Sequence, residues 1–447
     1  MSKSDQMRAY FDSQRTLDLD FRLEQLKRLR RGIEEREEQI LGALAADLGK
    51  SHYEAYFTEI GIVYHEISYY LAHLSRWVGK KRVRPSLASI PSCSYTIAQP
   101  LGVVLIISPW NYPFQLSILP LISAIAAGNC VLLKPSSRSS ATFSVLKDLI
   151  TSLYDPSYIS LSNDRSVVEE QWDHIFFTGG TQTGRLIASS AARRLIPTTL
   201  ELGGKSPAIV TESAHIRLAA RKIIWGKCLN SGQTCVAPDY VLVDARQKGL
   251  LVEAMKSEVV AMFGTDPLSS PDLASIIDSD HFNRLISLFD GGTLLWGGQI
   301  DPKRLRIAPT LIGAVDLTSP LMQEEIFGPI LPIIEFHDFD EALAFVKARA
   351  HPLAAYLFSG DVHQQRRFER ELSFGGGCIN DVVVHLSNSR LPFGGVGESG
   401  MGSYHGKAGF LAFSHTKAIV KGSSIIDIPV RYAPFPNALG VLKKILR

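Results

Sequence analysis

The feature of this sequence that most constrains its fold is a regular alternation of short, branched-apolar runs with longer helical segments. The runs that predict buried strands are 103–107, 131–134 and 175–178. The segments that predict helices are 116–127, 141–153 and 181–192. Strands that alternate with helices form parallel sheets with helices on both faces. We therefore predict a doubly wound α/β domain over this region.

The same alternation resumes further along the chain. The predicted strands of this second block are 208–210, 240–243, 330–335 and 355–358. Its predicted helices are 218–228, 250–263 and 340–349. A chain of 447 residues is too long for one small core, and 45% of it is apolar. We therefore expect two parallel-sheet domains.

The segments around these blocks predict helices and a hairpin. Apolar residues at helical spacing predict one long amphipathic helix over 19–46, and a second helix is expected over 55–78. The stretch 79–100 is basic and then rich in Ser, Thr and Pro, with β-forming residues near Tyr95. It predicts a hairpin that leaves the main body and pairs with a C-terminal strand at 418–421.

Charge and cysteine usage exclude several classes of protein. The net charge is +3 and 20% of residues are charged, so nothing indicates a nucleic-acid partner. The five cysteines show no metal-binding spacing, and His385 and His405 lack a second ligand nearby in the sequence, so we expect no metal site and a reducing compartment. The first 20 residues are polar, and no apolar run approaches the roughly 20 residues of a membrane span. We expect a soluble, cytoplasmic protein.

Cys235 and Glu201 form the pair of residues that most strongly suggests chemistry. Cys235 follows a polar, turn-prone approach, and Glu201 precedes Gly203 and Gly204, where backbone can come close to a ligand. A thiolate can attack a carbonyl carbon, and a carboxylate can activate the water that releases the acyl group. Considered singly, Cys235 could be a small core residue and Glu201 an exposed carboxylate at a strand end. The pairing favours covalent catalysis at a carbonyl.

Three further segments could hold ligands, and each also has a plain structural interpretation. Asn111 follows a buried strand and could donate to an oxyanion or simply form a turn. The glycines at 179–184 open a helix and could approach phosphate, or form an ordinary strand–helix loop. Lys134 and Glu325 could hold ribose hydroxyls, although a solvated lysine and an edge carboxylate are the alternatives.

Taken together, these segments resemble the NAD(P)-dependent aldehyde dehydrogenase superfamily. The resemblance extends over about 57–418 and rests on seven motifs in the family's order. They are Pro109–Phe114, Lys134–Ser136, Phe177–Gly184, Glu201–Pro207, Gly232–Cys235, Glu325–Pro329 and Pro392–Gly395. The segments 176–179, 237–240 and 401–406 resemble class 3 members in particular. Such members act on medium-chain, fatty and aromatic aldehydes and are commonly dimeric.

The resemblance implies a role for each candidate residue. Cys235 would be the nucleophile, Glu201 the general base, and Asn111 would complete the oxyanion hole with the backbone N–H of Cys235. Lys134 would hold the adenosine ribose, Glu325 the nicotinamide ribose, and Phe327 would pack near the nicotinamide. The remaining implied coenzyme contacts are Trp110, Ser137, Thr178, Gly179, Gly180, Gly184 and Leu202. Tyr64 and Phe393 are candidates for lining the substrate pocket.

The resemblance also implies domain limits and a coenzyme. The coenzyme domain would comprise 1–81 and 101–203, the catalytic domain 204–395, and a bridging hairpin with a C-terminal tail 82–100 and 396–447. Many relatives carry Glu where Ser137 stands, and a carboxylate there repels the 2′-phosphate of NADP. We therefore expect NAD or NADP, with NADP tolerated.

Other functions remain open from the residues alone. A CoA-acylating aldehyde dehydrogenase should lack the general base, so Glu201 argues against it, whereas a cysteine esterase would need no nicotinamide. A membrane-surface interaction protein is the non-enzymatic alternative, supported by a basic amphipathic tail at 438–447. A tail this short more often packs on its own protein or on the partner subunit of the expected homodimer.

Overall fold

The computed structural model describes residues 2–86 and 89–446. The first of its sheets has six strands. In spatial order these are β17 (Gly400–Met401), β7 (Thr198–Glu201), β6 (His174–Thr178), β3 (Val103–Ser108), β4 (Cys130–Pro135) and β5 (Ile159–Leu161). All pair in parallel except the edge strand β17, which is antiparallel to β7. The predicted strands of the first block are confirmed, and their carboxyl ends lie at one edge of the sheet.

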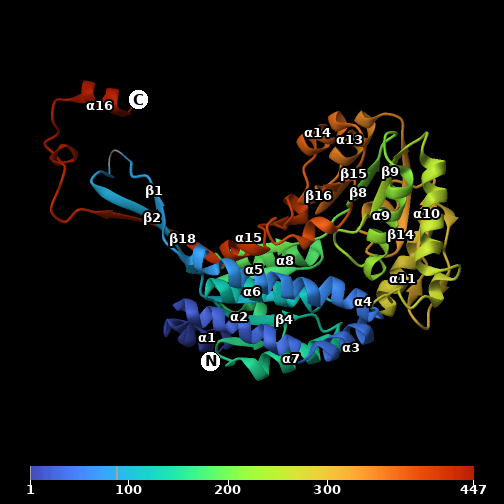
Figure 1. Ribbon diagram of the computed structural model, residues 1–447, viewed down its shortest axis with the longest axis horizontal. Helices are drawn as coiled ribbons and strands as arrows, with labels where there is room; N and C mark the ends of the chain where they lie inside the picture. Colours follow the sequence, from blue (N-terminus) through green and yellow to red (C-terminus); the bar gives the residue numbers. More distant parts are fainter. Residues whose placement is uncertain (1, 87–88, 447) are drawn as a thin grey trace.

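Helices cover this first sheet on both faces (Figure 1). They are α1 (Lys3–Asp12), α2 (Leu19–Glu34), α3 (Glu37–Leu48), α4 (His52–Ala55), α5 (Gly61–Val78), α6 (Gln115–Ala127), α7 (Ser140–Leu153) and α8 (Thr181–Ala192). Every residue of α6 is buried, because this helix lies between the sheet and the helices α2, α5 and α15 (Gly406–Ala412).

The predicted single helix over 19–46 is wrong, because the chain forms two helices that meet at Glu35 and Arg36. Arg36 leaves helical geometry with φ −119° and ψ 12°. Its guanidinium donates to Asp148 at 2.8 Å and to Ser152 at 3.0 Å, both on α7. The helix expected over 55–78 is present as α5, preceded by a π-helical turn, η2 (Tyr56–Ile60).

The second sheet has seven strands. In order they are β10 (Thr293–Trp296), β13 (Thr310–Gly313), β14 (Ile330–Phe336), β9 (Tyr240–Asp244), β8 (Pro207–Val210), β15 (Ala354–Phe358) and β16 (Gly376–Ile379). Only β10 runs antiparallel to its neighbour. The helices of this part are α9 (Ile216–Cys228), α10 (Lys248–Phe263), α11 (Ser279–Ser287), α12 (Pro320–Gln323), α13 (Phe339–Lys347) and α14 (Val362–Glu371).

Alternating strand residues show that this sheet is also covered on both faces. Val241 and Val243 of β9 join the core that contains α9 and α10. Tyr240 and Leu242 of the same strand join the core formed with α13 and α14. Strand side chains point to opposite faces in turn, so the second doubly wound sheet follows the predicted alternation. A two-stranded ribbon, β11 (Ile300–Asp301) with β12 (Arg306–Ile307), lies outside it.

The hairpin leaves the body of the molecule as the sequence predicts (Figure 1). Its strands are β1 (Lys81–Val83) and β2 (Ser92–Pro100), and β18 (Ser414–Gly422) pairs with β2 from Ser414↔Pro100 to Gly422↔Ser92. The chain then extends to α16 (Leu439–Leu446), beyond the hairpin. No helix in the described ranges has the length and apolar character to cross a membrane.

The start of the segment predicted as bridge and tail, 396–447, packs elsewhere. β17 joins the first sheet beside Glu201, and α15 packs against α5 and α6. Tertiary pairing therefore places 400–412 with the residues predicted to bind coenzyme, although these positions are distant in sequence.

Candidate active site

Cys235 lies in a loop whose backbone has an unusual conformation. After α9 ends at Cys228, three successive residues adopt left-handed φ values, with Asn230 at 50°, Ser231 at 51° and Gly232 at 75°. A Cβ at position 232 would overlap the carbonyl oxygen of Gly328. The glycine therefore allows the loop to dock closely on the chain after Phe327.

Buried hydrogen bonds hold the loop from behind. The Gln233 amide donates to the carbonyls of Asn230 and Ser275, each at 3.0 Å, and its oxygen accepts from the N–H of Ile277 at 3.0 Å. The hydroxyl of Ser231 donates to the carbonyl of Ala274 at 2.5 Å. These contacts anchor the loop to the segment before α11 and leave Cys235 half-buried at its end.

Glu201 is the last residue of β7 and is 2% exposed. Neither carboxyl oxygen has a hydrogen-bond partner within the part of the chain that the structure describes. Burial raises the pKa of this carboxyl well above its usual value. Burial, with the nearby carboxyls of Glu325 and Glu201, likewise raises the pKa of the Cys235 thiol.

Two cavities meet at these residues. One, of about 150 Å³, is mainly apolar, and its lining includes Phe57, Trp225 and Phe393. The other, of about 260 Å³, is more polar, and its lining includes Asn111, Gly179 and Glu325. The residues common to both linings are Leu116, Thr178, Glu201, Leu202 and Cys235.

Asn111 joins the first sheet to the Cys235 loop. It follows β3, is 3% exposed and lines the polar cavity. Its amide nitrogen donates to the carbonyl of Gln233 at 2.9 Å, and its own carbonyl accepts from the Asn230 amide at 2.7 Å. The side chain therefore points at the backbone that carries Cys235.

Glu325 and Phe327 form the far wall of the polar cavity. The Glu325 carboxyl lies against the backbone of Gly203, where a Cβ would collide with it. Burial and Asp239 raise the pKa of Glu325 to about 8, while the Gly204 N–H, Lys205 and Lys227 oppose the shift. The Phe327 ring stands edge-on to Trp110, with centroids 5.4 Å apart.

The structure also places the remaining predicted coenzyme residues. Trp110, Thr178, Gly179, Gly180 and Leu202 line the polar cavity, whereas Lys134, Ser137 and Gly184 do not. Lys134 lies at the carboxyl end of β4, at the same sheet edge, and Ser137 is exposed just beyond it. Gly184 packs α8 against Leu202, whose side chain a Cβ would strike.

The polar cavity fits the phosphate–ribose part of a dinucleotide. Gly180 is the N-cap of α8, and a Cβ there would meet nothing within 4 Å, so the helix N-terminus faces open space. A wider groove of about 750 Å³ continues from Gly180 past Gly203 to Glu325. Bare helix N–H groups suit phosphate, and a carboxylate suits ribose hydroxyls.

Two residues that line the polar cavity had no signal in the sequence. His281 and Arg284 on α11 border the polar cavity, and the His281 ring nitrogen lies 2.8 Å from the carbonyl of Phe327. Tyr404 and His405 border the apolar one. Of the two predicted liners, Phe393 does line it, but Tyr64 does not and instead donates to Glu37 at 2.9 Å. Among described residues there is no His, Cys, Asp and Glu grouping suited to a metal.

Comparison with known proteins agrees with this geometry. The model of the aldehyde dehydrogenase family matches residues 3–419. The chain is 44% identical to 4,4'-diaponeurosporen-aldehyde dehydrogenase of Staphylococcus aureus, over 98% of this chain and 96% of that protein. It is 42% identical to the dimeric NADP-preferring aldehyde dehydrogenase of Canis lupus familiaris, with 96% of each covered. A substrate-bound structure of Staphylococcus aureus AldH superposes with a TM-score of 0.96 at 43% identity, covering 99% of this chain and 98% of that one.

The chain therefore belongs to the aldehyde dehydrogenase family. It is an NAD(P)-dependent enzyme that oxidises aldehydes to carboxylic acids, and its similarity is to family 3 members. The fold and the enzyme class predicted from the sequence are thus confirmed.

Proposed function

We propose that Cys235, Glu201 and Asn111 carry out this reaction on long-chain or aromatic aldehydes. The observation that supports the assignment is that Cys235 and Glu201 border both the apolar cavity and the polar cavity. An aldehyde in the first and a dinucleotide in the second would therefore meet at these two side chains.

The chemistry divides into two halves. The Cys235 sulfur, as thiolate, forms a bond to the aldehyde carbon, and the carbonyl electron pair moves to oxygen. The Asn111 amide and the backbone N–H of Cys235 donate to that oxyanion. A nicotinamide held by Glu325 and Phe327 would supply the acceptor for the hydride that leaves this carbon, so that a thioester would remain on Cys235.

Hydrolysis of the thioester is assigned to Glu201. Its carboxylate takes a proton from water while the water oxygen bonds to the acyl carbon, and the carbon–sulfur bond then breaks. Burial raises the pKa of Glu201 well above its usual value, which makes its carboxylate a stronger base toward water. The acid leaves, the Cys235 thiolate is restored, and the proton from water remains on Glu201 until it passes to solvent.

The coenzyme contacts follow from the polar cavity. Glu325 and Phe327 would hold the nicotinamide end, and Gly179, Gly180 and Leu202 would border the phosphates. Lys134 and Ser137, farther along the same sheet edge, would take the adenosine ribose. Ser137 carries no charge, so it would admit the 2′-phosphate of NADP as well as the hydroxyl of NAD.

The preference for long or aromatic aldehydes rests on where the apolar cavity leads. Phe57, Ile62 and Ser387 border both this cavity and a surface hollow of about 470 Å³. Tyr53 and Phe57, stacked at 6.3 Å, line that hollow and are exposed by 81% and 53%. An apolar chain that extends past the cavity would therefore still find apolar contacts.

A series of straight-chain aldehydes from 2 to 16 carbons, with benzaldehyde, tests the substrate class. The value of kcat/KM should rise with length and remain high beyond the length that fills the inner cavity. Phe57→Ser should lower kcat/KM for the long aldehydes and leave the short ones unchanged. A maximum at 2–4 carbons would reject the proposal.

The hairpin and tail suggest a homodimer. The relative from Canis lupus familiaris is named as dimeric, and β18 is a solvent-exposed edge strand whose Val420 is 61% exposed. Exposed strand edges and apolar side chains favour pairing with another chain. Light scattering coupled to gel filtration should show twice the chain mass.

For the C-terminal tail, contact with a membrane surface is the alternative to contact with a partner subunit. Leu439, Val441 and Leu442 of α16 are 50–61% exposed, beside Lys443 and Lys444. Flotation with anionic liposomes, with and without residues 438–447, separates membrane contact from subunit contact.

Five free cysteines fit a reducing, cytoplasmic location.

A further inference from the structure

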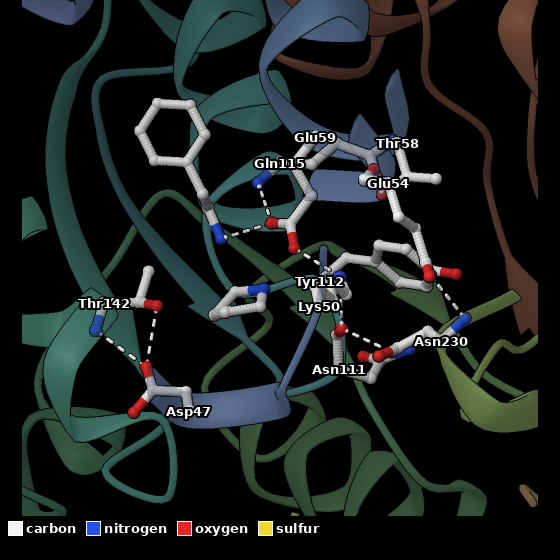
Figure 2. Close-up of polar contacts among 12 residues, drawn as sticks. Asp47, Lys50, Glu54, Thr58, Glu59, Asn111, Tyr112, Gln115, Thr142 and Asn230 are labelled. Atoms are coloured by element: carbon white, nitrogen blue, oxygen red, sulfur yellow. Dashed lines mark hydrogen bonds and ion pairs between the residues drawn. The ribbon is translucent and has the colours of Figure 1, made fainter. Parts of the chain in front are cut away.

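A fully buried ion pair lies behind Asn111, outside both cavities (Figure 2). Lys50, just beyond α3, and Glu59, in the π-helical turn η2, approach to 2.5 Å, and both side chains have 0% exposure. The second Glu59 oxygen accepts the backbone N–H groups of Phe114 at 2.9 Å and Gln115 at 3.1 Å. Glu59 therefore holds the first turn of α6.

Lys50 contacts the same segment from the other side. Its ammonium group donates to the carbonyl of Asn111 at 3.3 Å and lies 4.0 Å from the centre of the Tyr112 ring. The Tyr112 hydroxyl in turn lies 2.6 Å from the hydroxyl of Thr234. The backbone from Asn111 to Gln115 is thus fixed at both ends by one ion pair.

Stability alone explains such a pair poorly. Removing two charges from water costs several kcal/mol per ion, and apolar replacements of a buried pair are often neutral or stabilising. Losing only one partner is strongly destabilising, because the other charge remains buried. A buried pair next to a reaction centre is better explained by the geometry that it enforces.

We propose that Lys50 and Glu59 are positioning residues that set the direction of the Asn111 amide. They touch neither cavity, so they act through the backbone of 111–115. This inference rests on the proposed oxyanion role of Asn111. The Cys235 loop contacts this segment through Gln233 and Thr234. It also has anchors of its own at Ala274, Ser275 and Ile277, so we expect the loop to stay in place when the pair is removed.

The double variant K50M/E59Q separates positioning from stability. It removes both charges, and the Gln oxygen still accepts from Phe114 and Gln115, so the melting temperature should return toward wild type relative to K50M alone. The contact to the Asn111 carbonyl stays lost. The rate of the NAD(P)H burst at saturating coenzyme should therefore remain at least about 10-fold lower, since small misplacements of catalytic groups have effects up to about 100-fold.

A second measurement locates the defect. Alkylation of Cys235 by iodoacetamide needs no oxyanion donor and should stay within about threefold of wild type. Asp47→Asn is the matched control, because Asp47 likewise holds a helix start, accepting from Ala141 at 3.0 Å and Thr142 at 2.7 Å on α7. It should lower the melting temperature and leave the burst rate unchanged.

The outcomes are distinct. The inference is overturned if the burst rate of the double variant recovers together with its melting temperature. It is also overturned if the double variant does not fold, or if its rate of Cys235 alkylation falls in parallel with the burst rate. N111A tests the underlying assignment separately, with an expected loss of about 100-fold or more. If N111A keeps a normal burst, the oxyanion role itself fails, whatever the ion-pair variants show.

Discussion

Gly203 and Glu325 are in direct contact: the Glu325 carboxyl lies where a side chain on residue 203 would stand. Glu325 follows α12 in the second domain, and Gly203 follows β7 of the first sheet. The contact therefore brings a carboxyl from beside the second sheet to the edge of the first sheet where we propose that the coenzyme binds.

Gly203→Ala should displace the Glu325 carboxyl and weaken coenzyme binding. We expect the KM for coenzyme to rise about 10-fold, equivalent to about 1.4 kcal/mol, with a smaller change in kcat. Gly42→Ala in α3 is a suitable control, because a Cβ there meets nothing within 4 Å. An unchanged coenzyme KM in G203A would remove Glu325 from the coenzyme site.

Cys235→Ala should abolish dehydrogenase turnover, with kcat reduced by about 1,000-fold or more, because no other group forms the covalent intermediate. Cys93→Ser, at an exposed cysteine on the hairpin, should leave activity intact.

In the coenzyme-free wild type, the rate of Cys235 alkylation should keep rising up to pH 9 without a plateau, because burial raises the pKa of its thiol. A plateau near pH 7 would contradict that shift.

Glu201→Gln should separate the two halves of the reaction. Hydride transfer does not need the carboxylate, so rapid mixing with aldehyde and NAD(P) should show a burst of reduced coenzyme close to one per active site. Steady-state turnover should fall about 100-fold or more, since general acid–base catalysis contributes about 100- to 10,000-fold. Mass spectrometry should detect the acylated protein, and a folded variant without a burst would argue against the assigned role.

The same substitution predicts a pH-dependent change in stability. The pKa of Glu201 is higher in the folded than in the unfolded chain, so folding takes up a proton above about pH 4.5, the usual pKa of a Glu side chain, and the wild type loses stability as pH rises. Gln cannot ionise, so the advantage of E201Q over wild type should grow as pH rises above about 4.5, by up to about 1.4 kcal/mol per pH unit, and level off once Glu201 is ionised in the folded protein. Denaturant melts across this range measure it, and a constant difference would show that Glu201 is ionised in the folded protein.

Ser137→Glu should shift coenzyme preference toward NAD. A carboxylate at this exposed position repels the 2′-phosphate of NADP, so kcat/KM for NADP should fall about 10-fold or more while that for NAD holds or rises. Ser137→Gln is the uncharged control and should show a smaller shift. Strict use of NAD by the wild type would remove the basis for this prediction.

The sequence by itself determined the alternation of central strands with helices in both sheets and the candidate residues that follow those strands. Runs such as 103–107 and 175–178 show a local periodicity, and the residues that follow them, including Asn111 and Gly179, share one sheet edge because parallel strands end together. The sequence alone also marked Cys235, Glu201 and Glu325 as candidates, because the residues that identify each of them lie next to it in the chain.

Only the tertiary structure decided which of these groups meet and what surrounds them. The break at Arg36 depends on Asp148 and Ser152, more than 100 positions away. Glu201 is only 2% exposed at the end of β7, where β17, distant in sequence, pairs with it. Lys50, Glu59 and His281 carry no motif, since their roles come from packing between elements distant in sequence, and local periodicity contains no information about such contacts.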